Sequence, residues 1–206
     1  MNIIKQATYD SHDVHVHSRD YVFRGFIQVE KVCLTHRLFN QTEYTPVIQR
    51  ELIRRPEAAG VLLYSSAQQK VALIEQFRIG AMDDADSPWQ LEVIAGVLDG
   101  DESPESCIQR ESLEESGCSI GQPTHLFTFY PSAGACAEIF HLYSADVHLP
   151  SEGGVFGMPD EGENIKLHII NYRDVPDLLT SGRLKNAPVI MALQWLQQRI
   201  NTTGSV

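Results

Sequence analysis

The sequence predicts a helix in the middle of this chain, between short apolar segments, and carries a signal for each of its ends. Ser103 followed by Pro104 is typical of a helix N-cap and first turn, and Gly117 is typical of a C-terminal stop. The spacing predicts a helix of about a dozen residues between them. Because short β-rich segments flank this helix on both sides, the chain is predicted to fold as a mixed α/β protein.

The strand signals come from short runs of β-branched and aromatic residues. Residues 14–35 predict two or three strands broken near Gly25, and the runs at 58–64 and 70–77 flank a polar turn as in a buried hairpin. Further strands are expected in residues 88–96, 125–130, 138–147 and 166–172, and helices in residues 174–182 and 187–200.

The strand pattern weakens into a turn-rich connection at residues 36–47, so we expect a domain boundary there. Residues 1–45 are predicted to form a small β-sheet domain. Residues 46–206 are predicted to form the main domain, which carries the marked helix.

Composition limits the classes of partner. The formal net charge is −11, which argues against nucleic-acid binding because such proteins neutralise phosphates with Lys and Arg. No run reaches the roughly 18 apolar residues needed to cross a bilayer. The four cysteines are scattered without a CxxC pair, as in proteins of a reducing compartment. We therefore expect a cytoplasmic protein with neither a nucleic-acid nor a membrane partner.

The predicted helix carries a cluster of carboxylates. Glu111 and Glu115 are four residues apart and Glu114 is three residues from Glu111, so these side chains share one face. Like charges repel there, and a cation that prefers oxygen ligands, Mg²⁺ or Mn²⁺, would offset the repulsion. A solvated acidic face with Arg110 as its counterion would show the same pattern, so the residues alone leave both interpretations open.

The same segment resembles the Nudix box. That pattern has a glycine, five residues, a glutamate, seven residues, then Arg-Glu, two residues, Glu-Glu, one residue and a glycine. Ser112 and Cys118 stand where the family has bulky aliphatic residues, which affects packing under the helix more than ligation. All the fixed positions match, at Gly96, Glu102, Arg110, Glu111, Glu114, Glu115 and Gly117.

The resemblance extends over nearly the whole chain. From FRGF near residue 23, through HRLFN, LIEQFR, PWQLEVIAG, the PSAG loop, DEGEN and the ending APVIMALQWLQ, the sequence resembles the bacterial ADP-ribose pyrophosphatases. Those enzymes split ADP-ribose into AMP and ribose 5-phosphate. The resemblance implies a Nudix α/β/α sandwich, and a small N-terminal antiparallel sheet exchanged between the subunits of a homodimer.

The resemblance also implies roles for individual residues. The metal ligands would be Glu111, Glu115, Glu163 and the backbone carbonyl of Ala95, with Glu161 as the base that activates water. Glu114, Glu102 and Arg110 would support them. Phe26 and Ile27 would pack on the adenine from the partner subunit, Arg50 and Arg78 would line the nucleotide, and Val97, Ser132, Gly134 and Glu138 would lie near the diphosphate and terminal ribose.

The resemblance therefore predicts an Mg²⁺-dependent hydrolase that acts on the pyrophosphate bond of ADP-ribose. Two alternatives remain open from sequence. One is a Nudix hydrolase of another nucleoside diphosphate sugar, and the other is a nucleotide-binding sensor that keeps the fold without turnover.

Overall fold

A computed structural model describes residues 6–39, 42–158, 160 and 162–203 of the protein. The chain divides into two compact units. The small unit contains the described residues up to Arg55 together with Tyr130–Glu138, and the large unit contains Pro56–Phe129 and the described residues from Ile139 onward.

The small unit is built on a three-stranded antiparallel sheet in the order β1-β2-β3. A short 3-10 turn, η1 (Ser11–Asp13), precedes β1. The break expected near Gly25 is confirmed, since Gly25 N donates to Ile27 O at 2.9 Å in the turn between the first two strands. The strands are β1 (Val14–Arg24), β2 (Gln28–His36) and β3 (Ile48–Arg54).

A distant loop completes the small unit. Ile53 N of β3 donates to Ala135 O at 2.8 Å, and Ala137 N donates to Ile53 O at 3.0 Å. Arg55 pairs with Glu138 at 3.3 Å. The division expected after residue 45 therefore falls inside a unit that continues through β3 and takes up this loop.

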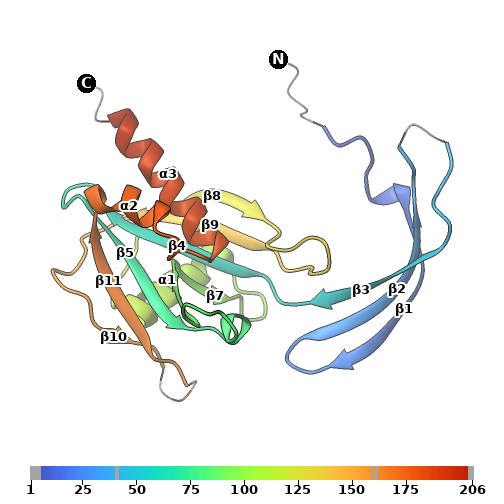
Figure 1. Ribbon diagram of the computed structural model, residues 1–206, viewed down its shortest axis with the longest axis horizontal. Helices are drawn as coiled ribbons and strands as arrows, with labels where there is room; N and C mark the ends of the chain where they lie inside the picture. Colours follow the sequence, from blue (N-terminus) through green and yellow to red (C-terminus); the bar gives the residue numbers. More distant parts are fainter. Residues whose placement is uncertain (1–5, 40–41, 159, 161, 204–206) are drawn as a thin grey trace. The chain divides into compact units, whose positions relative to one another are not determined.

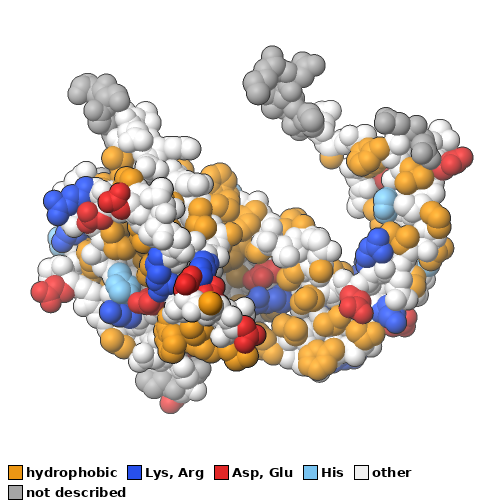
Figure 2. Space-filling view, viewed as in Figure 1, with side chains coloured by type: hydrophobic (Ala, Val, Ile, Leu, Met, Phe, Trp, Pro, Cys, Tyr) orange, Lys and Arg blue, Asp and Glu red, His pale blue; other side chains and the backbone are white. Residues whose placement is uncertain are grey.

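The first strand of the small unit has little cover. Every residue of β1 is exposed, on both faces of the strand. Its apolar members include Val22 and Phe23, which are 53% and 54% exposed, and Phe26 in the following turn is 86% exposed. Figure 2 shows hydrophobic side chains at the surface of this unit.

The large unit contains an eight-stranded mixed sheet. Its main path is β10-β11-β5-β4-β9-β8, with β6 paired to β5 and β7 paired to β4. Only β4 and β9 run parallel among these pairs of the described chain, and β4 is buried along its whole length. The strands are β4 (Ala58–Ser65), β5 (Lys70–Phe77), β6 (Trp89–Glu92), β7 (Ile94–Val97), β8 (Thr124–Phe129), β9 (Phe140–Asp146), β10 (Val155–Phe156) and β11 (Ile165–Asn171).

Helices cover both faces of this sheet, as the α/β/α fold class requires. Figure 1 shows α3 (Ala187–Thr203) in front of the sheet and α1 (Pro104–Ser116) behind it. One apolar core lies on the α3 side and includes Leu193, and the other lies on the α1 side and includes Ile108. The remaining helices are α2 (Val175–Thr180) and the 3-10 turns η2 (Ile79–Ala81) and η4 (Tyr172–Asp174). None of the helices in the described ranges has the length and apolar character to cross a bilayer.

The marked helix is confirmed at both ends. The Ser103 hydroxyl accepts a hydrogen bond from Ser106 N at 3.2 Å, so it caps α1. Gly117 follows the helix with φ of +68°, a left-handed conformation that favours glycine. The two caps fix where α1 begins and ends, so residues of the segment itself determine which helix positions the glutamates occupy.

Candidate active site

Glu111 and Glu115 of α1 face the backbone of β7. Glu115 Oε2 accepts a hydrogen bond from Ala95 N at 3.1 Å. Gly96 lies directly beside the Glu111 carboxylate, and a Cβ built on Gly96 would overlap that carboxylate. The first glycine of the box therefore makes room for Glu111, and the two carboxylates sit side by side against one strand.

Burial makes the charge of this pair costly. Glu115 is 2% exposed, and burial raises the pKa of its carboxyl to about 8, with the nearby charges of Glu111 and Glu163 adding to the rise. Burial also raises the pKa of Glu111 above its usual value, although Arg110 opposes this. A cation beside the pair would offset the mutual repulsion of the two carboxylates.

Arg110 binds the outer carboxylates of the cluster. Its Nε and Nη2 donate to Glu102 at 3.2 and 3.1 Å, and its Nη1 donates to Glu111 at 2.6 Å and to Glu114 at 3.1 Å. These bonds raise the pKa of Arg110, chiefly through Glu102. Arg110 is thus a local counterion, but none of its bonds within the described chain reaches Glu115, so the solvated-face interpretation accounts for only part of the cluster.

The loop before β11 brings a further carboxylate near the pair. Glu163 is half-buried, and its Oε2 accepts a hydrogen bond from Met158 N at 3.1 Å. Its charge acts on both Glu111 and Glu115. Glu161, the residue expected to act as the base, lies outside the described residues.

The donor set fits a hard divalent cation. Across the described parts of the chain, no three His, Cys, Asp or Glu side chains gather closely enough to enclose an ion by themselves. Mg²⁺ does not require such a cage, because it usually takes one or two carboxylates and completes its shell with waters and substrate phosphates. Glu111, Glu115 and the carbonyl of Ala95 supply oxygen donors of that kind.

Arg78 lies within electrostatic reach of the pair and has a partner that sequence reasoning missed. Burial opposes its charge, but Glu92, Glu115 and Glu163 together raise the pKa of Arg78 above its usual value. Glu92 is 5% exposed and binds the Arg78 guanidinium at 2.7 Å. The available signal was a glutamate directly between two apolar residues, Leu91 and Val93, of the strand segment PWQLEVIAG.

The expected substrate residues are distributed over both units. Val97 is at the end of β7 and Arg78 follows β5, both in the large unit. In the small unit, Arg50 of β3 is exposed and donates to its neighbour Gln49 O at 2.8 Å. Five more of the expected substrate residues lie in the small unit. Phe26, Ser132 and Gly134 are exposed, and Ile27 and Glu138 are half-buried.

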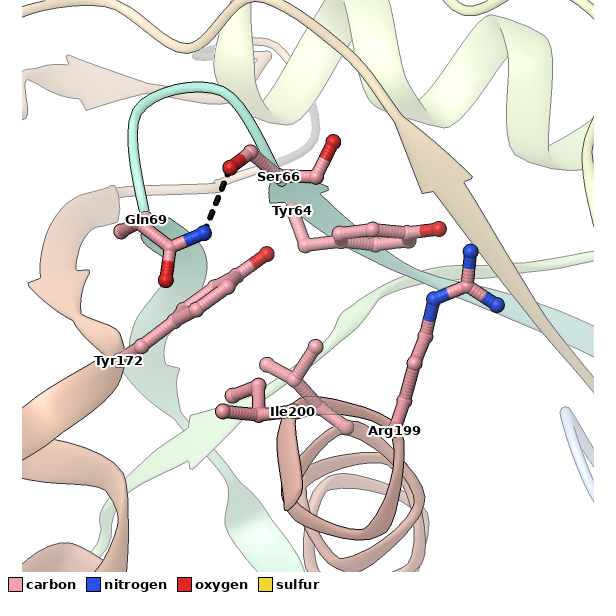
Figure 3. A pocket seen from close by; sticks show the side chains of 7 residues that line it. Tyr64, Ser66, Gln69, Tyr172, Arg199 and Ile200 are labelled. Carbon is pink, nitrogen blue, oxygen red and sulfur yellow. Dashed lines mark hydrogen bonds between the residues drawn. The ribbon is translucent and has the colours of Figure 1, made fainter. Parts of the chain in front are cut away.

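A cavity of about 400 Å³ lies on the other face of the large sheet, beside α3 (Figure 3). Within it, Gln69 Nε2 donates to Ser66 O at 2.6 Å. None of the described residues expected at the site lines it, so this cavity is separate from the carboxylate cluster. The lining residues are Tyr64, Ser66, Gln69, Tyr172, Leu196, Arg199 and Ile200.

The chain is similar to known proteins over most of its length. The NUDIX domain family model matches residues 54–193. The chain is 33% identical over 191 residues to the ADP-ribose pyrophosphatase of Escherichia coli strain K12, covering 93% of this chain and 91% of that protein. It is 31% identical to the ADP-ribose pyrophosphatase of Haemophilus influenzae, covering 92% of this chain and 88% of that protein.

A GDP-mannose pyrophosphatase of Salmonella typhimurium strain LT2 is also similar. It is 33% identical over 150 residues, which cover 72% of this chain and 78% of that protein. Among solved structures, the crystal structure of an ADP compounds hydrolase superposes with a TM-score of 0.68 at 21% identity, covering 94% of this chain and 97% of that one.

Proposed function

Because this chain belongs to the Nudix domain family, we propose that it hydrolyses the pyrophosphate bond of ADP-ribose, giving AMP and ribose 5-phosphate, with Mg²⁺ as its cation. The observation that carries the proposal is the pair of adjacent carboxylates held against β7, of which Glu115 is buried and Glu111 is half-buried. The ADP-ribose pyrophosphatases of Escherichia coli and Haemophilus influenzae support ADP-ribose as the substrate, because each aligns with this chain over most of the length of both proteins.

The reaction adds one water across the P–O–P linkage of the diphosphate. The water oxygen forms a new P–O bond, the bridging P–O bond breaks, and the products are two phosphate monoesters. Mg²⁺, when bound, supplies positive charge that offsets the diphosphate and makes the attacking water more acidic. The chain must hold this cation, orient the diphosphate and accept the proton of the water.

The residues divide these tasks. Glu111, Glu115 and the Ala95 carbonyl would hold the cation, with Glu163 from the later loop as a further ligand. Arg78 would bind an anionic oxygen of the substrate through charge-assisted hydrogen bonds. Glu161 would accept the proton as a general base.

The direct test is release of AMP from ADP-ribose, with and without Mg²⁺. Glu115→Gln is expected to lower kcat by about a thousandfold, because it removes a negative ligand at the point where charge develops. Glu105→Gln is the matched control, since this glutamate of the same helix instead accepts a hydrogen bond from Tyr143 at 2.8 Å. Full activity in the absence of any divalent cation would contradict the proposed chemistry.

The substrate itself is tested by a panel of nucleoside diphosphate sugars. Turnover strongest on GDP-mannose or another conjugate would keep the mechanism and replace the substrate, as the GDP-mannose pyrophosphatase relative suggests. Binding of ADP-ribose without turnover of any conjugate would identify the chain as a nucleotide sensor.

We also propose a homodimer, in which the small unit contributes Phe26 and Ile27 to the site of the partner. An edge strand exposed on both faces with apolar side chains supports this, since such a surface is normally covered. Phe26→Ala is expected to raise KM by about tenfold with little change in kcat, as loss of uniform binding does. Light scattering that finds only a monomer would refute the dimer.

We also propose that the protein works in the cytoplasm. All four cysteines are free, and free thiols are typical of a reducing compartment. Fractionation of the cells that express the chain would test this location.

A further inference from the structure

Glu92 binds Arg78 by one edge of its guanidinium. Arg78 Nε donates to Glu92 Oε1 and Oε2 at 3.1 and 3.0 Å, and Nη2 donates to Oε2 at 2.7 Å. No hydrogen bond to Nη1 is formed by any described residue, and the Arg78 side chain is 44% exposed. The other edge of the guanidinium is therefore open to an anion that comes from outside the chain.

Glu92 is itself anchored on its far side. Asn186 Nδ2 donates to Glu92 Oε1 at 3.0 Å, and Gln76 Nε2 donates to Oε2 at 3.3 Å. Asn186 directly precedes α3, and its backbone oxygen accepts from Ile190 N at 3.4 Å. The position of the carboxylate is thus tied to the start of the last helix.

The residue before Asn186 fixes the segment that follows Arg78. Lys185 Nζ donates to both oxygens of Asp84 at 2.6 and 2.8 Å and to Asp86 at 2.6 Å. The two residues directly before α3 therefore hold Arg78 and the segment that follows it. Asn186 acts through Glu92, and Lys185 acts through Asp84 and Asp86.

Arg78 also lies beside the carboxylate cluster. The charges of Glu115 and Glu163 both act on it. A diphosphate bound by a cation at Glu111 and Glu115 would therefore lie within electrostatic reach of Arg78.

We propose that Glu92, anchored by Asn186, is a positioning residue that presents the open edge of Arg78 to an anionic oxygen of the substrate diphosphate. The inference rests on the proposed function. An arginine side chain loses rotamer entropy when it is ordered on binding, and holding it in place beforehand removes that loss from the binding step. Glu92 thus acts on substrate affinity through Arg78 without contacting the substrate.

The test is a double-mutant cycle with two readouts. One is KM and kcat for ADP-ribose with Mg²⁺, and the other is the Kd of ADP-ribose measured by calorimetry without metal. Glu92→Gln is expected to raise KM and Kd by about tenfold and Asn186→Ala by about threefold, with kcat changed by less than about twofold. In an Arg78→Ala background neither change should have a further effect.

Asn171→Ala is the matched control. Asn171 Nδ2 also donates to a carboxylate, that of Asp174, at 3.1 Å, and Asn171 pairs with Lys70 at the end of β5 away from Arg78. Its KM and Kd should equal those of the native chain.

Three results would overturn the inference. A Glu92→Gln protein with a lower Tm but native KM and Kd would show that the pair only stabilises the fold. An equal rise in KM in the native and Arg78→Ala backgrounds would show that Glu92 does not act through Arg78. A native chain that neither binds ADP-ribose nor releases AMP would overturn the proposed function, and this inference with it, whereas the first two results leave that function intact.

Discussion

Two buried glutamates of the large unit, Glu92 and Glu115, have opposite surroundings. Glu92 accepts hydrogen bonds from Arg78, Gln76 and Asn186, so its charge is compensated. Glu115 accepts a single bond, from Ala95 N, within the described chain. Its strongest neighbouring charge is that of Glu111, followed by that of Arg78, which forms no hydrogen bond to Glu115 in the described structure. A buried carboxylate that the chain leaves uncompensated is a candidate cation ligand, whereas a compensated one holds other residues in place.

Addition of Mg²⁺ gives the largest expected difference between the two glutamates. A ligand at one hundred times its Kd stabilises a folded protein by about 2.7 kcal/mol. The native chain and Glu92→Gln should both show this increase in free energy of unfolding, and EDTA should reverse it. Glu115→Gln should not, and an equal increase in that variant, measured by denaturant titration, would place the cation elsewhere.

Metal-free stability should separate the same two substitutions. Glu92→Gln removes a charge that Arg78 and Asn186 bind and is expected to cost about 2 kcal/mol. Glu115→Gln removes a carboxyl whose charged form burial disfavours and which has no cationic hydrogen-bond partner among the described residues, so it should leave stability unchanged or higher. Urea unfolding in EDTA measures both, and a large loss only in Glu115→Gln would reverse the comparison.

Ser112 extends the comparison to a neutral group. It is fully buried in α1, and its hydroxyl has no hydrogen-bond partner in the described structure. Ser112→Ala is expected to stabilise the protein by about 1 kcal/mol, because it removes the unpaired hydroxyl and improves helix propensity.

The neighbouring Ser116 is the control for that substitution. Its hydroxyl donates to Ser112 O at 2.5 Å and accepts from Cys118 N at 3.3 Å. Ser116→Ala should therefore destabilise the protein. If Ser112→Ala lowers the melting temperature as Ser116→Ala does, the Ser112 hydroxyl has a partner in solution.

Glu30 of the small unit supplies the smallest test, through pH. It pairs with Arg54 at 3.2 Å and Arg19 at 2.9 Å, and the bond to Arg54 is the main reason that the pKa of Glu30 is lowered. A lowered pKa means that the contribution to stability is complete above about pH 4.5 and is lost as the pH falls through the folded value.

The native chain should therefore exceed Glu30→Gln in stability at pH 7, and the gap should narrow toward pH 3.5. Unfolding free energies of both proteins at the two pH values measure this. A gap that widens on acidification would mean that Glu30 resembles Glu115, whose pKa is raised.

Sequence reasoning succeeded where the signal was local. The caps Ser103 and Gly117 predicted the limits of α1, and two short apolar runs on either side of a polar turn predicted the β4–β5 hairpin. It failed for β3, whose sequence IQRELIR has no clear alternation and which forms because it pairs with β2 along its whole length. The run expected as one strand at residues 88–96 became β6 and β7, since each pairs with a different neighbour.

The sequence by itself determined the helix that carries Glu111 and Glu115, because caps and residue spacing act within one segment. Only the tertiary structure decided which glutamates are compensated. The partners of Glu92 come from β5, the residue after it and the segment before α3, so the bonds exist only once these elements have packed. A charge's partners in space are set by packing, and one position in a sequence carries no record of them.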